Sequence, residues 1–382
     1  MTPKMEEDQN NLKEFGFEDP FGKDFSDRLN NLQKAILDSY DGKKYERQEL
    51  LNGYQPKAYK QKKTYPQPSW HIYDQATRKE KLMFLTMLNA SIEHLNLEFN
   101  YKGNGRPKVD LKDIIKCLCI KTYSNYSSWR AGSELKLAKA MGIIEHDYKR
   151  STLVKYLSSS EITPYLHLIY KTIAEPIKSV EITFSVDASG ISQFNKSRWI
   201  NVRTEKKKHK DYAKIHIVSG NKTNIITSAK ITKGSGKGSH ESPHFKPLIE
   251  DTAKIFTIKE VMADAGYLSR ENADTVSKLG AVPYIMPKKG VKSRNMGSET
   301  GAWGRMIHLW KQYKTIFAYH YHQRSNVEST FWMIKRKFGH YVRTKLPEAQ
   351  ENEVLTKVIC HNISVLAEAM LTYDISPEFM VS

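Results

Sequence analysis

The sequence predicts an α/β protein in which a mixed sheet flanked by helices follows an all-α region. Two observations carry this prediction. Apolar residues recur at helical spacing through residues 75–178, and from residue 180 onward short alternating segments typical of strands are interleaved with helical ones. Residues 1–74 show neither pattern. We therefore expect three parts: an irregular polar and basic arm at 1–74, a helical domain at 75–178 and an α/β domain at 179–382.

The arm begins acidic and ends basic, in the segment YQPKAYKQKKTYPQPSW, and its periodicity allows one short helix near 26–38. Four lysines near its end alternate with three tyrosines, an arrangement that suits a phosphate backbone and exposed bases. These residues are Lys57, Lys60, Lys62, Lys63, Tyr54, Tyr59 and Tyr65. A solvated linker explains the same composition equally well.

In the helical domain, apolar residues recur at three- and four-residue steps from Leu82 to Leu95, and Asp110 is a predicted helix N-cap. Farther on, SSWRAGSELKLAKAMGI and STLVKYLSSS predict two short helices around a break. Such a pair is a candidate helix-turn-helix, with Lys149, Arg150, Ser151 and Thr152 at the start of its second helix. Packing of an ordinary helical pair is an equally good interpretation.

The α/β domain opens with four predicted strands, EITFSVD, RWINVRTE, AKIHIVSG and NIITSAKIT. Helix FKPLIEDTAKIF, strand KEVMAD, helix SRENADTVSKLG, strand AVPYIMP and a helix through MIHLWKQYKTIF follow. The order β-β-β-α-β-α-β-α is that of a ribonuclease H-like fold with one additional strand or edge hairpin.

Two aspartates each follow a short apolar run and precede a small residue and a glycine. They are Asp187 in DASG and Asp264 in DAGY, and we expect both carboxylates at the carboxyl-terminal ends of strands, as metal ligands. A third acid, Glu328, lies in YHQRSNVESTFWMIK, a predicted helix. At about 100° per residue its polar neighbours fall with it in a stripe roughly 60° wide. The stripe contains Tyr321, Arg324, Glu328 and Lys335, and the adjoining face carries Val327, Phe331, Ile334 and Phe338 for packing.

The balance of 60 Lys and Arg against 42 Asp and Glu gives a net charge of +18, which indicates a polyanionic partner. We see no uninterrupted apolar run of 18 residues and no basic-then-apolar leader, so nucleic acid is favoured over a membrane. Cys117, Cys119 and Cys360 form no CxxC pair, and their odd number is typical of reduced core thiols in a cytoplasmic protein.

The spacing Tyr-x2-Arg-x3-Glu-x6-Lys, downstream of DASG- and DAGY-type aspartates, resembles the DDE transposases of bacterial and archaeal insertion sequences, in the group with the YREK signature. GRPKVDLKDIIKCLCIK resembles the helical segment that precedes the group's catalytic domain, and the resemblance covers about residues 75–372.

The resemblance implies a ribonuclease H-like catalytic domain in which Asp187, Asp264 and Glu328 hold two Mg²⁺ ions, with Mn²⁺ as a substitute. It further implies that Tyr321, Arg324 and Lys335 contact DNA. The expected partners are the terminal repeats of the element and target DNA, bound by a homodimer or higher oligomer at the nucleoid in the cytoplasm.

Several of these residues also have plainer interpretations. Asp187 alone could be a turn residue and Asp264 a cap, while Arg324 and Lys335 could form surface ion pairs. His240, Glu241 and Ser242 precede a helix and could approach the site, although a capping role is favoured. Two other functions stay open: a metal-dependent nuclease without strand transfer, and a non-catalytic DNA-binding protein derived from a transposase.

Overall fold

The computed structural model describes residues 70–99, 109–193, 212–234, 240–288, 291 and 301–380. Residues Pro68–Ser382 form one compact unit. The predicted arm up to residue 69, its helix near 26–38, its Lys/Tyr cluster and the predicted strand RWINVRTE lie outside the described residues.

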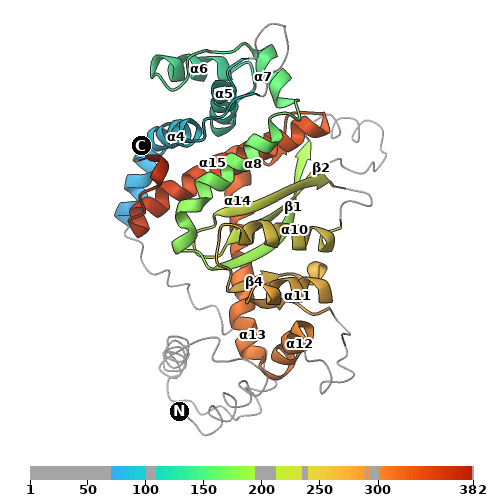
Figure 1. Cartoon of the computed structure of the whole chain (residues 1–382). Helices are drawn as coiled ribbons and strands as arrows, with labels where there is room; N and C mark the ends of the chain where they lie inside the picture. The colour runs from blue at the N-terminus through green and yellow to red at the C-terminus, as the bar shows by residue number, and fades with distance from the viewer. Residues whose placement is uncertain are drawn as a thin grey trace. The chain divides into compact units, whose positions relative to one another are not determined.

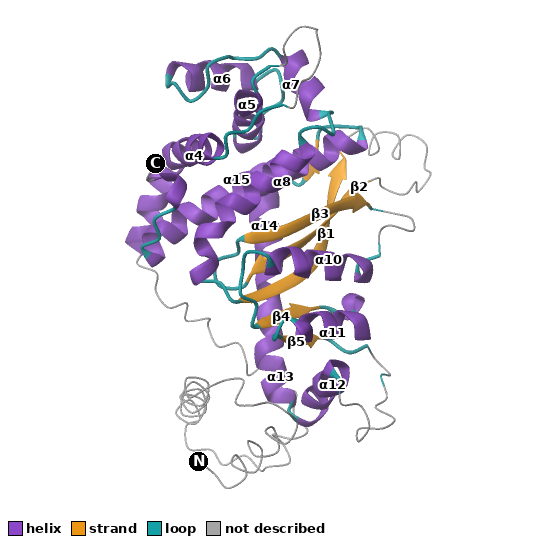
Figure 2. Cartoon of the chain, in the orientation of Figure 1, coloured by secondary structure: helices purple, strands orange, loops and turns teal. Residues whose placement is uncertain are grey.

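A mixed sheet forms the centre of this unit (Figures 1 and 2), which confirms the predicted α/β class. Its six strands are β1 (Thr183–Gln193), β2 (Tyr212–Gly220), β3 (Ile226–Lys233), β4 (Glu260–Ala263), β5 (Val282–Ile285) and β6 (Tyr341–Val342). The order across the sheet is β3-β2-β1-β4-β5. β1, β2 and β3 pair antiparallel, whereas β4 and β5 run parallel to β1. The two-residue strand β6, which the sequence did not predict, pairs with the far end of β1.

Helices cover the sheet on both faces, and Figure 1 shows α10 in front of the strands and α14 behind them. The helices of this part are α10 (Ser242–Ala253), α11 (Arg270–Lys278), α12 (Ala302–Gln312), α13 (Lys314–Tyr321) and α14 (Ser325–Phe338). Each turns an apolar side inward, and the four residues predicted to pack α14 are all buried. This packing fixes α14 against β1 and β2.

All elements described between Trp70 and Ser179 are helical. They are α4 (Trp70–His94), α5 (Leu111–Tyr123), α6 (Ala131–Ala140), α7 (Arg150–Leu157), α8 (Thr163–Ala174) and the 3₁₀ helix η1 (Glu175–Ser179). The predicted N-cap is confirmed, since the Asp110 carboxylate accepts a hydrogen bond of 2.7 Å from the amide of Asp113. The connection between α6 and α7 runs from Met141 to Lys149. It is longer than the turn of a helix-turn-helix, which has about 3–4 residues.

One long helix, α15 (Pro347–Tyr373), packs against α4, α5, α8 and β3. Among the described residues it is the helix that meets the length and composition of a membrane span, and 78% of its most apolar window is buried inside the protein. Its apolar run is interrupted by polar residues, so the sequence pattern does not mark it as one continuous apolar helix. Two of these, Asn352 and Asn362, are completely buried.

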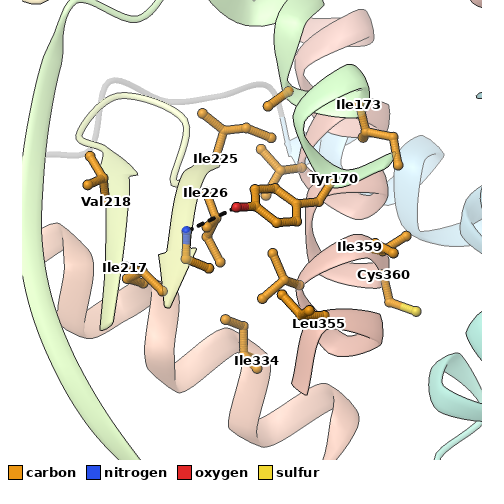
Figure 3. Close-up of a cluster of buried hydrophobic side chains, with 14 of the residues drawn as sticks. Tyr170, Ile173, Ile217, Val218, Ile225, Ile226, Ile334, Leu355, Ile359 and Cys360 are labelled. Atoms are coloured by element: carbon orange, nitrogen blue, oxygen red, sulfur yellow. Dashed lines mark hydrogen bonds between the residues drawn. The ribbon is translucent and has the colours of Figure 1, made fainter. Parts of the chain in front are cut away.

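The buried polar groups of α15 hydrogen-bond to its neighbours. Asn352 donates to the carbonyls of Leu157 and Ser159 at 2.9 and 2.8 Å, beside the end of α7. Asn362 accepts from the amide of Ile226 at 3.0 Å and donates to the carbonyl of Tyr170 at 3.1 Å. Figure 3 shows the apolar cluster around Tyr170, whose hydroxyl accepts from the Ala229 amide at 3.1 Å. α15 therefore joins the helical part of the chain to the sheet in one core.

The three cysteines are free and buried, as the sequence predicts. Cys360 of α15 donates through its thiol to the carbonyl of Cys119 at 3.4 Å. All three are therefore core thiols, with Cys119 and Cys360 buried where α5 meets α15 and Cys117 beside the carbonyl of His146.

Candidate active site

Asp187 lies in the middle of β1, so the prediction that it ends a strand is wrong. β1 pairs with β4 only as far as Val186, opposite Ala263, and then continues beside β2 to Gln193. The strand that ends here is β4. Asp187 is thus the first residue of β1 after the part that pairs with β4. Its side chain is 16% exposed, although β1 lies in the middle of the sheet.

Asp264 follows β4 directly and begins the 3₁₀ helix η2 (Ala265–Tyr267). Its carboxylate accepts a hydrogen bond of 2.8 Å from the amide of Gly266, so the capping interpretation is also correct. A Cβ atom at position 266 would lie 2.9 Å from Asp264 Oδ1 and 2.4 Å from Oε2 of Glu241. The glycine in DAGY therefore lets two carboxylates approach one backbone position.

The segment around Glu328 is not one continuous helix. Tyr321 ends α13, residues His322–Arg324 form the 3₁₀ turn η3, and α14 begins at Ser325 with Glu328 in its first turn. The single stripe, expected from a continuous helix at about 100° per residue, is wrong at its amino-terminal end, because a 3₁₀ turn winds with about three residues per turn. Only Glu328 and Lys335 share α14.

Arg324 links two of the three predicted acids. Its Nη1 lies 3.3 Å from Oδ2 of Asp187, and its Nη2 lies 2.6 Å from Oε1 of Glu328. The guanidinium also lies 5.9 Å from the ring of Tyr321. The surface ion pair at i,i+4 is present between Arg324 and Glu328. The contact with Asp187 of β1 also makes Arg324 a bridge between residues that are distant in the sequence. Burial lowers the pKa of Arg324, but Glu328, Tyr321 and Asp187 raise it above its ordinary value, so it stays charged.

Asp187 is largely buried and lies near two acids and one guanidinium. The pKa of Asp187 is raised to about 6, chiefly by burial and to a smaller extent by the nearby Asp264 and Glu241, although the Ala188 amide and Arg324 lower it. One nearby guanidinium does not offset these effects. The Asp187 carboxylate therefore lies where added positive charge stabilises its ionised form.

Glu241 is the acid at this site that sequence reasoning assigned to capping. It precedes α10, but its side chain makes no capping hydrogen bond. Its Oε1 instead lies 2.8 Å from Nζ of Lys214 on β2, and its other oxygen faces Gly266. The capping interpretation is wrong, because the β2 lysine attracts the carboxylate away from the helix end. The local sequence carries no signal for this contact.

Lys335 and Tyr321 complete the predicted set. Lys335 Nζ donates to Oγ of Ser189 at 2.7 Å, and burial lowers its pKa. Since Ser189 is two residues after Asp187 on β1, Lys335 lies on the same face of the strand as that acid. Tyr321 stacks on Phe317 with ring centroids 6.0 Å apart, and burial raises its pKa. Tyr321 is thus partly packed as well as close to Arg324.

Carboxylate oxygens are the ligands that Mg²⁺ and Mn²⁺ prefer, so Asp187, Asp264 and Glu328 fit such ions by donor type. As arranged, the described residues contain no group of three or more His, Cys, Asp or Glu side chains that could hold a metal ion. Arg324 accounts for part of this geometry, because it contacts both Asp187 and Glu328. Glu328 is 60% exposed, so its rotation is not blocked by packing.

Comparison with known proteins gives one family match. Residues 178–363 match the family model described as "Transposase DDE domain". No curated protein matches the chain. Among solved structures, the piggyBac transposase in a synaptic complex with hairpin DNA aligns at 11% identity and a TM-score of 0.36, over 78% of this chain and 75% of that one. The matched family segment contains all six predicted site residues, and it is this segment that is similar to transposase DDE domains.

Proposed function

We propose that the protein is a transposase of an insertion sequence, of the YREK group, that binds terminal repeats and catalyses DNA strand cleavage and strand transfer. The observation that carries the proposal is the Arg324 bridge between Asp187 and Glu328, inside the segment that matches a transposase DDE domain. The strand order β3-β2-β1-β4-β5 with three antiparallel strands supports a ribonuclease H-like catalytic domain at 179–382.

Asp187, Asp264 and Glu328 are the residues that would hold two Mg²⁺ ions, or Mn²⁺ in their place. Such ions, when bound, activate a water or 3′-hydroxyl and neutralise charge at the phosphorus. The two acids near Asp187, which are Asp264 and Glu241, support this assignment, because a bound cation would stabilise the ionised forms of neighbouring carboxylates.

The cations of the site would bind the phosphates on either side of the cut. The Arg324 guanidinium already donates to two carboxylates, and phosphate oxygens accept the same paired N–H groups. Lys335, held on β1 by Ser189, would contact a flanking phosphate as a point charge. Tyr321 would contact DNA beside Arg324.

The partners proposed are terminal-repeat and target DNA, in agreement with the charge of +18. Residues 75–178 would read the repeats, and a homodimer or higher oligomer would assemble on DNA, at the nucleoid.

A cleavage and strand-transfer assay tests the proposal. Purified protein is incubated with labelled terminal-repeat DNA and a target plasmid, in Mg²⁺, in Mn²⁺ and in EDTA. We expect metal-dependent nicking followed by joined products. Cutting without joining would assign the protein to the nucleases, and specific binding without cutting would assign it to the non-catalytic DNA-binding proteins.

A further inference from the structure

The short segment between α5 and α6 separates two hollows in the protein surface. On one side Asn125, Tyr126, Ser127 and Arg130 line a hollow of about 270 Å³ together with Arg343. On the other side Ser128 and Trp129 line a hollow of about 450 Å³ together with residues of α6 and the start of α7. Because Ser127 and Ser128 are consecutive, the two hollows adjoin across one turn of chain.

An exposed tryptophan lies at the larger hollow. The side chain of Trp129 is 74% exposed, the largest exposure among the large apolar residues described. The guanidinium carbon of Arg150 lies 4.9 Å from its ring centroid. A cation over one face leaves the other face of the indole available for a flat, electron-rich partner. Tryptophan is enriched at binding interfaces, where one part of its ring is apolar and the indole N–H is polar.

The charge of both hollows is positive. The larger one is lined by Lys136, Lys149 and Arg150 against the single acid Asp147. Asp147 is itself near a cation, since its carboxylate lies 3.8 Å from Nζ of Lys139. The smaller one has two arginines and no acid. Such a surface is complementary to an anion with flat rings, which describes a nucleic acid strand.

Arg343 connects these hollows to the sheet. Its guanidinium donates to the carbonyl of Asn125 at 3.1 Å and to the hydroxyl of Tyr341 at 2.9 Å. Tyr341 belongs to β6, which pairs with β1 at Ser192, five residues beyond Asp187 on the same strand. Arg343 of the smaller hollow is therefore linked, through Tyr341 and β6, to the end of β1 that lies beyond Asp187.

We propose that these two hollows form a binding site for single-stranded DNA, in which an unpaired base stacks on Trp129 and the phosphates contact Arg130, Arg150 and Arg343. The site rests on the proposed function, because strand cleavage produces the DNA ends that carry unpaired bases. An intact duplex hides the faces of its bases, so the tryptophan selects unpaired ones. A volume of about 450 Å³ lies within the ~300–1,000 Å³ of small-molecule sites and accommodates one nucleobase.

The test uses the full-length protein and two DNA duplexes of equal length, one blunt and one with a short single-stranded overhang containing 2-aminopurine. Fluorescence anisotropy measures affinity, and quenching of 2-aminopurine reports stacking. We expect tighter binding of the overhang duplex and strong quenching. Trp129→Ala should lose about 5- to 150-fold in overhang affinity together with the quenching, and should bind the blunt duplex as before.

Two further variants separate stacking from folding. Trp129→Phe keeps an aromatic face and should restore most of the quenching. Leu137→Ala removes an apolar side chain of α6 that is 58% exposed and lies outside both hollows, and it should behave as the wild type. Arg150→Ala should weaken overhang binding and reduce its dependence on salt, whereas Arg150→Lys should keep the salt dependence.

The outcomes distinguish this site from the proposed function. Equal affinity of the wild type for both duplexes, or full quenching by Trp129→Ala, would overturn the single-strand site and leave the transposase proposal intact. Self-association that Trp129→Ala abolishes, without any overhang preference, would assign the hollow to a second protein copy. Failure of the wild type to bind either duplex would overturn both proposals.

Discussion

Glu353 and Asp187 are both largely buried carboxylates, but their surroundings differ. Glu353 is 3% exposed and accepts hydrogen bonds from the amides of Arg343 and Thr344 and from the Thr344 hydroxyl, at 2.9–3.1 Å. Asp187 accepts one hydrogen bond from the next amide and one of 3.3 Å from Arg324, and lies near two other acids. The Glu353 carboxylate therefore holds the local backbone and has a structural role. The Asp187 carboxylate accepts fewer hydrogen bonds and has capacity for further ligands.

Glu181 resembles Glu353 in its burial and in the donors around it. It is 1% exposed and accepts from the amides of Lys222 and Thr223 and from the Thr223 hydroxyl, where the turn after β2 passes beneath it. Burial raises its pKa, and these three donors lower it. A buried acid with its donors in place therefore indicates structure, whereas an acid short of donors and near other acids indicates a site for cations.

The largest effect expected is on catalysis. Asp187→Asn, Asp264→Asn and Glu328→Gln each remove a proposed metal ligand without changing size, which should cost several kcal/mol of transition-state stabilisation, a loss of about 10³-fold or more in cleavage rate. DNA binding should stay nearly unchanged. Gel-based cleavage assays and gel shifts measure the two effects, and full cleavage by any one variant would contradict the assignment.

Glu353→Gln should affect stability instead. The substitution leaves its amide donors imperfectly paired and removes the charge beside Lys357 and Lys121, which are 2% and 4% exposed. We expect a loss of about 3–5 kcal/mol in the free energy of unfolding, measured by urea denaturation. Cleavage per folded molecule should be unaffected. A large catalytic defect in the folded variant would remove the distinction between the two kinds of acid.

Asp187 should show a pH dependence of stability in metal-free protein. Its pKa is raised from 3.8 to about 6, so the ionised form is less stable in the folded state than in the unfolded one. Stability is therefore highest below about pH 4 with respect to this group and falls as pH rises through about 6. Asp187→Asn should remove this fall and stabilise the protein at pH 7 by about 3 kcal/mol.

Thermal melting in EDTA, from pH 4 to pH 8, measures this effect as the difference between the wild type and D187N. Added Mg²⁺ should stabilise the wild type and leave the variant unchanged. If the difference in melting temperature between the wild type and D187N does not vary with pH, the Asp187 carboxyl has an ordinary pKa.

The smallest effect concerns the phosphate contacts. Lys335→Ala removes one cation, and we expect about a tenfold loss in affinity for the cleavage substrate and a decrease of about 1 in the slope of log affinity against log salt. Arg324→Ala should show a similar salt effect and a larger catalytic defect. If either variant melts far below the wild type while its activity per folded molecule is normal, the residue is structural.

The predicted α/β class and most of the strand and helix positions followed from local periodicity, because each element needs only its own apolar pattern to be visible. The presence of Asp187, Asp264 and Arg324 at the candidate site could also be predicted, because short sequence motifs mark these residues. The 3₁₀ turn at His322–Arg324 could not, because neither proline nor glycine occurs there to signal a break. The position of Glu241 beside the candidate site could not be predicted either, because its partner Lys214 is remote in sequence.

The length of β1 shows a further limit of local patterns. The sequence predicted its end at Asp187, where the apolar run stops, but antiparallel pairing with β2 extends it to Gln193. Strand length is decided by the partner strands, and these are remote in sequence. For the same reason the two-residue β6 was not predicted.

The position of α15 has a consequence for synthesis on the ribosome. This helix is made after every helix that it packs against, and it supplies the buried amides that pair with the ends of α7, with α8 and with β3. Until it has left the exit tunnel, the apolar faces of α4, α5 and α8 lack their main partner. The helical region therefore completes its folding only after residues 347–373 have emerged, and a chain released before residue 347 should expose these apolar faces and be prone to aggregation and proteolysis.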